Sequence, residues 1–132
     1  MKKVQVIIEK NDDGLWGRIP EYPSVFTYGK TMSEVESNAI IALQLYFEEL
    51  PLEWNDIEIE LLMDLEQFFK INDYINVTKL ARRVGINTSL LRQYARGIKY
   101  PGVRQVAKIE AGLRDIGEEL VKTQLLGRPV RI

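Results

Sequence analysis

The stretch from Asn76 to Pro101 constrains the fold most, because it joins two short helical patterns through a specific turn. Gly85 stands where the first helix must end, and glycine adopts a left-handed backbone at no steric cost. Asn87 can cap the next helix through its side-chain oxygen. Gly97 and Pro101 then end that second helix. Two helices joined in this way have the geometry of a DNA-binding helix-turn-helix, although a plain helical hairpin in a bundle would share it.

The segment LARRVGINTSLLRQYARGIKYP resembles the Cro/repressor-type helix-turn-helix. The positions that match the family pattern are Leu80, Ala81, Gly85, Ile86, Asn87, Leu91, Gly97 and Pro101. Ala95 departs from the pattern, because the family usually has Glu there. A side-chain contact that braces the second helix is therefore expected to be missing.

This resemblance also implies which residues would contact DNA. The residues expected to read bases lie on one face of the second helix: Thr88, Ser89, Arg92 and Gln93. Arg can bind guanine, and Gln adenine, through paired hydrogen bonds. The residues expected to contact phosphates are helix caps and cations: Asn76, Lys79, Asn87, Arg96 and Lys99. A solvated basic face would contain the same residue types.

The charge is divided between two halves of the chain. Residues 1–70 contain six Lys/Arg and fourteen Asp/Glu, a balance of −8, whereas residues 71–132 contain twelve and five, a balance of +7. Such a division indicates two domains with different partners, and a basic domain gains affinity for DNA by releasing counterions. We expect domains over residues 1–64 and 65–126, followed by a short basic tail over 127–132.

The composition argues against an enzyme. The chain has neither Cys nor His, so thiolate chemistry, the commonest general base and the commonest metal ligand are all missing. Asp12 and Asp13 invite interpretation as a nuclease metal site, but an Asn-Asp-Asp-Gly turn explains them better. We expect no cofactor and no metal. Without a long apolar run or a signal segment, we expect a cytoplasmic protein with no membrane partner.

The first half shows the pattern of an α+β domain. Strands are expected over residues 4–8, 15–19, 25–28 and 57–63, and a helix over 32–49 begins at a capping box of Thr31 and Glu34. The apolar stripe of that helix runs from Val35 to Leu50. We predict a small antiparallel sheet with this helix on one face, while the other face stays open unless a partner covers it.

The second half is expected to be all-helical. Its first helix should begin at Leu65, with Asp64 as the cap. The helical spacing of apolar residues over 106–120 fits either one long helix or two short ones, since Gly112 and Gly117 interrupt it. Trp16 and Trp54 are expected to be core or rim residues, with no special role for either.

The segment DDGLWGRIPEYPSVFTYGKTMSEVESNAIIAL resembles the N-terminal domain of HicB-type antitoxins. Ser24-Val25 replaces the usual Gly-Cys of that family. The resemblance implies a partial ribonuclease H-like fold that binds HicA, a small RNA-cleaving toxin. It also implies that the chain represses its own operon, for which a homodimer or a higher homo-oligomer is needed to read a palindrome. A stand-alone prophage-type repressor with a degenerate HicB-like domain is the alternative.

Two pairs of residues are candidates for the toxin interface, Ile41 with Leu45 and Glu58 with Glu60. The first pair lies one helical turn apart, outside the expected core stripe, and exposed apolar pairs mark interfaces. The edge of a wide buried stripe would look the same. The second pair points to one side of a strand and would attract a basic RNA-binding protein, although a solvated sheet face would also carry it.

Overall fold

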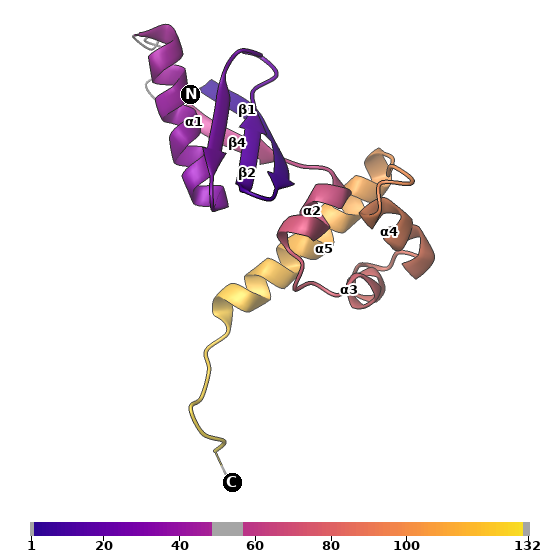
Figure 1. The fold of residues 1–132 in the computed structure, drawn as a ribbon. Coiled ribbons are helices and arrows are strands. Elements are labelled where there is room, and N and C mark those ends of the chain that lie inside the picture. Colours follow the sequence, from indigo (N-terminus) through magenta and orange to yellow (C-terminus); the bar gives the residue numbers. More distant parts are fainter. Residues whose placement is uncertain (1, 49–56, 131–132) are drawn as a thin grey trace. The chain divides into compact units, whose positions relative to one another are not determined.

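The computed structural model describes residues 2–48 and 57–130 (Figure 1). In these ranges the chain contains a four-stranded mixed sheet and five helices, which confirms the predicted α+β class. It divides into two compact units, Met1–Tyr74 and Ile75–Ile132, and each is described by itself. Within the described ranges, no helix combines the length and apolar character that a membrane crossing requires.

Three consecutive strands form an antiparallel meander: β1 (Lys2–Asn11), β2 (Gly14–Arg18) and β3 (Phe26–Gly29). The turn between β1 and β2 is held by the Asn11 side chain. Its Oδ1 accepts hydrogen bonds from the backbone N–H groups of Asp13 and Gly14, at 3.0 and 3.2 Å. An asparagine that bonds its own backbone in this way explains the Asn-Asp-Asp-Gly sequence as a turn.

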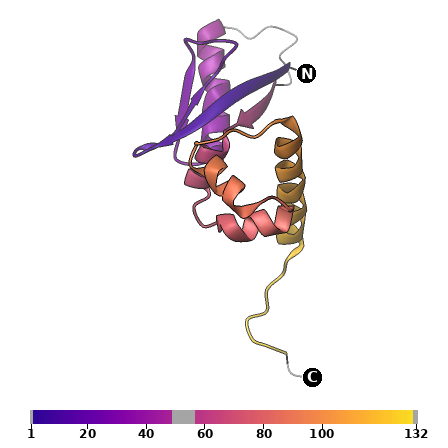
Figure 2. The same ribbon diagram turned by 90° about the vertical axis from the view of Figure 1, so that its right-hand side faces the viewer.

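Helix α1 (Met32–Phe47) begins at the capping box and packs on one face of the sheet (Figures 1 and 2). The Thr31 hydroxyl oxygen accepts a hydrogen bond from the Glu34 backbone N–H at 3.1 Å. The Glu34 carboxylate in turn accepts one from the Lys30 N–H at 2.6 Å, one residue before the cap itself. The helix side chains buried against the sheet are Val35, Ala39 and Leu43.

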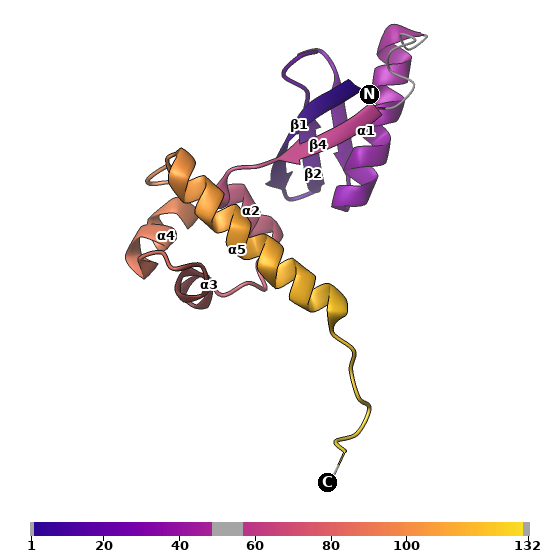
Figure 3. The ribbon, with the colours of Figure 1, turned by 180° about the vertical axis from the view of Figure 1, so that it is seen from behind.

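Strand β4 (Ile57–Leu62) shows that the prediction of a purely antiparallel sheet was wrong. It lies beside β1 (Figure 3) and pairs with it in parallel, with Lys2 opposite Ile57 and Ile7 opposite Leu62. The strand order is therefore β3-β2-β1-β4. The reason is the connection: α1 carries the chain back along the sheet, and the next strand therefore starts at the same end as β1. An alternating apolar pattern predicts a strand but does not indicate whether the strand runs parallel or antiparallel to its neighbour.

The core of the first unit lies between α1 and the sheet. Val4, Val6 and Ile8 of β1 are completely buried, while the alternating residues Lys3 and Gln5 are exposed and Ile7 is half-buried. The other buried residues of this core are Leu15, Ile19, Val25, Val35, Ala39, Leu43 and Ile59. The alternation fixes one sheet face against α1 and turns the other away from it. We call the second one the open face.

Helix α2 (Leu65–Ile71) starts at the predicted cap, because Asp64 Oδ1 accepts a hydrogen bond from the Gln67 N–H at 2.8 Å. Its partner is β1: Gln67 Oε1 accepts the Lys10 N–H at 2.8 Å. The last residue of the helix, Ile71, packs against the core of the first unit. Contacts therefore divide the chain after Tyr74, whereas the sequence suggested a boundary after residue 64.

The second unit contains α3 (Val77–Val84), α4 (Thr88–Ala95) and α5 (Val103–Lys122). Its buried residues are Leu80, Ala81, Val84, Ile86, Leu91, Tyr94 and Ile109. Of the two arrangements that the sequence allowed, α5 is the single long helix. Residues 123–130 follow it without helix or strand, and they include the described part of the basic tail.

Three expectations fall on residues 49–56, outside the part of the chain that the structure describes: the helix end at Glu49, the core position of Leu50 and the placement of Trp54. The final residues of the tail, 131 and 132, are also outside it.

Helix α5 approaches α3 closely at Gly112. A Cβ atom on Gly112 would lie 2.2 Å from Val84 Cγ1 and 2.9 Å from Val84 Cβ. Valine is branched at Cβ and has little freedom to move away. Gly117 lies further along the same helix, and a Cβ there would have no other atom within 4 Å. The first glycine is therefore required by packing, and the second is not.

We predict that Gly112→Ala lowers the free energy of unfolding by about 1–3 kcal/mol, because the added methyl overpacks against Val84. The matched control, Gly117→Ala, should raise it by about 0.5–1 kcal/mol, because alanine favours the helix and meets no clash. Urea unfolding followed by circular dichroism measures both. An equal gain from both substitutions would contradict the close packing of α3 and α5.

Candidate nucleic-acid interface

The residues expected to contact DNA lie on helices α3 and α4, at the caps of these helices and, for Lys99, just after α4. Each helix has an asparagine cap: Asn76 Oδ1 accepts the Lys79 N–H at 2.9 Å, and Asn87 Oδ1 accepts the Leu90 N–H at 3.1 Å. Gly85 ends α3 with φ of 77°, in the left-handed region that favours glycine. Each asparagine can donate to a phosphate through its side-chain NH₂ group, while its oxygen stays bonded to the helix backbone.

The expected base-reading residues differ in exposure. Ser89 and Arg92 are exposed, and Thr88 is half-buried. The Arg92 guanidinium donates a hydrogen bond from Nη2 to Thr78 Oγ1 at 2.7 Å, which ties the arginine of α4 to α3. Sequence reasoning missed Thr78, since it lies in the other helix and no local pattern connects the two residues. An exposed arginine is thus oriented from α3, although Ala95 offers no bracing side chain.

Gln93 lies at the border between the exposed face of α4 and the interior. Its side-chain Oε1 is buried and has no hydrogen-bond partner among the described residues. Its backbone carbonyl accepts hydrogen bonds from the N–H groups of Ile98 and Lys99 at 3.0 and 3.4 Å, which closes the end of α4. In this conformation Gln93 does not offer its side-chain oxygen to solvent.

The expected phosphate contacts Lys79, Arg96 and Lys99 are exposed cations. Within the described ranges the second unit has one ion pair, in which Arg83 Nη2 lies 2.7 Å from Glu119 Oε1. None of the three cations is therefore paired with a described carboxylate. Arg96 follows Arg92 by four residues and lies one helical turn beyond it, which extends the basic face past the end of α4.

The first unit places the expected toxin-contact residues on two different faces. Ile41 and Leu45 lie on the outer side of α1 and are 52% and 77% exposed. Glu58 is exposed and Glu60 is half-buried on the open face of the sheet. Each pair is brought together, but the sheet and α1 separate the pairs, so one flat contact does not cover all four residues.

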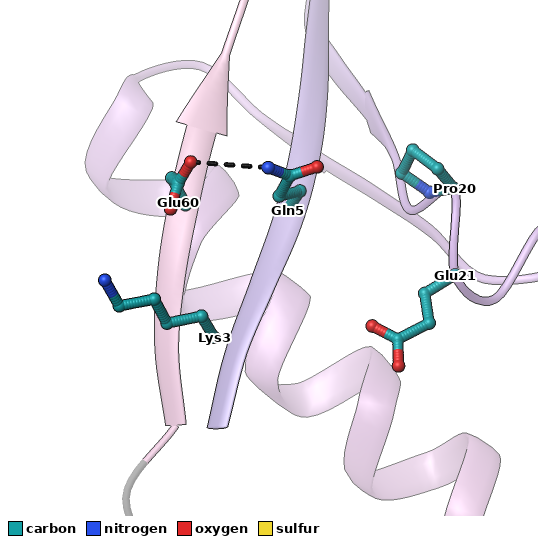
Figure 4. Close-up of a pocket in the computed structure, with 5 residues that line it drawn as sticks. All are labelled: Lys3, Gln5, Pro20, Glu21 and Glu60. Carbon is teal, nitrogen blue, oxygen red and sulfur yellow. Dashed lines mark hydrogen bonds between the residues drawn. The ribbon is translucent and has the colours of Figure 1, made fainter. Parts of the chain in front are cut away.

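A hollow of about 260 Å³ lies on the open face (Figure 4), and no sequence pattern indicated it. It is lined by Lys3, Gln5, Pro20, Glu21 and Glu60. Gln5 Nε2 donates a hydrogen bond to Glu60 Oε1 at 3.4 Å across the β1–β4 pair. Only the parallel register brings these two strands together with the loop after β2, which explains why local patterns could not reveal the hollow.

The carboxylate of Glu21 is held in its charged form. The ammonium of Lys2 lies 2.8 Å from Glu21 Oε1, and this hydrogen bond is the largest influence that lowers the pKa of Glu21. A slight loss of solvent acts in the opposite direction. Because the folded pKa lies below the unfolded one, the interaction stabilises the fold above the ordinary carboxyl range and is lost as the pH falls.

We predict that Lys2→Met raises the pKa of Glu21 towards its ordinary value, because the hydrogen bond and the nearby positive charge are removed. Carboxyl titration by NMR measures this change. Lys3→Met is the control, since Lys3 lines the same hollow and has no hydrogen bond with Glu21. A shift of the same size in both variants would mean that general charge, and not the Lys2 bond, lowers the pKa.

The chain matches no protein-family model, no curated protein and no solved structure. Across the described residues, no three Asp or Glu side chains gather closely enough to hold a metal ion.

Proposed function

We propose that this chain is a HicB-type antitoxin that binds a HicA-type RNA-cleaving toxin and represses its own operon through a helix-turn-helix. The observation that carries the proposal is the geometry of α3, the Gly85–Asn87 turn and α4, with exposed Arg92 held by Thr78. A preoriented arginine on the second of two such helices is the arrangement that reads guanine in the major groove.

The charge of the second unit supports a nucleic-acid partner. Residues 75–132 contain twelve Lys/Arg and four Asp/Glu, a balance of +8. Ser89, Arg92 and Arg96 follow one another at helical spacing and are all exposed. Cations on this face would bind phosphates flanking the bases, which supplies affinity without sequence preference.

The first unit supports a basic protein partner. Residues 1–74 contain six Lys/Arg and fifteen Asp/Glu, a balance of −9. An RNA-binding toxin has to attract phosphates, so its surface is complementary to this unit in charge. The mechanism in this proposal is steric, because a bound antitoxin blocks access of RNA to the toxin.

The proposed repressor acts as a dimer, because one short recognition helix contacts too few base pairs to select an operator. The end of α5 and the residues after it offer apolar surface for a second copy. Leu120 and Val121 are 66% and 87% exposed, and Leu125 is 90% exposed. A contact there would repeat one DNA-reading helix about a two-fold axis.

We predict that Arg92→Ala weakens binding to the promoter DNA of the chain's own gene by about 1–3 kcal/mol, with a smaller loss on scrambled DNA of equal length. Fluorescence anisotropy at fixed salt measures both. Arg114→Ala is the matched control, because Arg114 is an exposed arginine of α5, away from α4. Equal losses on the two DNAs would show that Arg92 contacts phosphate alone.

A growth assay of cells tests whether the chain neutralises a toxin. The short reading frame adjacent to this chain's gene is expressed alone and then together with the chain. We expect arrest in the first case and recovery in the second, because the chain would sequester the toxin. A harmless neighbour would refute the antitoxin proposal and favour the stand-alone repressor, which keeps DNA binding and has no toxin.

A further inference from the structure

The open face of the sheet carries a patch of apolar and aromatic side chains around one arginine. We call it the aromatic patch, and it consists of Ile7, Trp16, Arg18, Phe26, Tyr28 and Leu62. The strand register aligns four of these residues in a row across all four strands. Trp16 and Tyr28 form the next row, where their ring centroids are 4.8 Å apart.

The patch meets solvent although its residues are large and apolar. Phe26 is 61% exposed and Trp16 is 42% exposed, while Ile7, Tyr28 and Leu62 are half-buried. A contiguous apolar surface of this kind marks an interaction site. Trp, Tyr and Arg are also the residues that most often supply the binding energy of protein interfaces. The composition therefore fits a protein contact.

The hollow continues the patch along the same face. Gln5 and Glu60 each lie two residues from a patch residue on their own strands, β1 and β4, and therefore point to the same side. The carboxylates on and beside this face are Glu9, Glu21, Glu58 and Glu60. The cations are Lys2, Lys3, Arg18 and Lys30, and the Lys30 ammonium lies 5.7 Å from the ring centroid of Tyr28. The carboxylates of Glu21 and Glu60 line the hollow (Figure 4). The hollow therefore offers two carboxylates next to the aromatic patch.

The charge selects the kind of partner. Exposed aromatics on a sheet also stack on the bases of single-stranded RNA. Here, however, the whole unit has a balance of −9, and such a field repels phosphates. A basic protein gains from the same field, so it is the occupant that the observations favour.

We propose that the open face, composed of the aromatic patch and the hollow, is the surface on which the basic toxin docks. Trp16 and Phe26 provide the apolar anchor, and a Lys or Arg side chain of the toxin enters the hollow between Glu21 and Glu60. This inference rests on the proposed antitoxin function and adds the face that the toxin covers. The outer side of α1, with Ile41 and Leu45, stays outside the contact.

Hydroxyl-radical footprinting tests this on the unmodified chain, mixed with the purified product of the adjacent short reading frame. We expect protection of Trp16, Phe26 and Tyr28. Leu45 and Tyr46 of α1, which are 77% and 50% exposed, should react as in the free chain. Protection confined to α1 would overturn the inference.

Two variants give an independent test by titration calorimetry with the same product. Phe26→Ser should weaken binding by about tenfold or more, because it removes an interface anchor. Leu45→Ser removes an even more exposed apolar side chain from α1 and should leave the affinity unchanged. Both side chains are exposed, so neither substitution empties the core, and thermal melts of the free variants verify the fold.

The outcomes separate the two levels of the proposal. If the unmodified chain does not bind the product, the proposed function fails, and the docking face fails with it. If the unmodified chain binds and Leu45→Ser alone loses affinity, the function stands and the docking face is wrong. Protection of the aromatic patch by a single-stranded RNA, or by raising the concentration of the chain alone, would also overturn the inference.

Discussion

The pairing of β1 with both β2 and β4 is the constraint on which the first unit depends. Its alternating side chains form two surfaces from one strand: Val4, Val6 and Ile8 are buried under α1, while Lys3, Gln5 and Ile7 face the other way. A shift of one residue in either register would exchange these faces and bury charge. The same strand register therefore determines which residues form the core and which form the open face. The surface offered to a partner is as well defined as the core.

The second unit combines a small buried core with a solvent-exposed basic face. Its buried core is small, and it depends on a close approach of α3 and α5 that the absence of a side chain at Gly112 permits. In the proposed function, α4 must also keep its cations exposed to solvent. The Arg92–Thr78 hydrogen bond orients the Arg92 side chain and still leaves it exposed. Such preorganisation lowers the entropy lost when a ligand binds.

Local chemistry was predictable from the sequence, and long-range geometry was not. The caps at Thr31, Asp64, Asn76 and Asn87 lie where residue type alone placed them, since a cap acts within three residues. The parallel direction of β4, the packing of α2 on the first unit and the Thr78–Arg92 bond depend on partners distant in the chain. The same limit applies to the hollow, whose lining comes from two strands and a loop. The exposure of Ile41 and Leu45 could not be predicted either, because it depends on which side of α1 the sheet covers.

The parallel β1–β4 pair also has a consequence for the order in which the chain folds. Gln5 and Glu60 meet across that pair although they are 55 residues apart, whereas Arg83 and Glu119, which join α3 to α5 in the second unit, are 36 residues apart. Distant contacts form slowly because a long loop must close first, and local helical contacts form quickly. The first unit cannot close its sheet until β4 has been synthesised and has found β1. The half that leaves the ribosome first is thus the half expected to finish folding last.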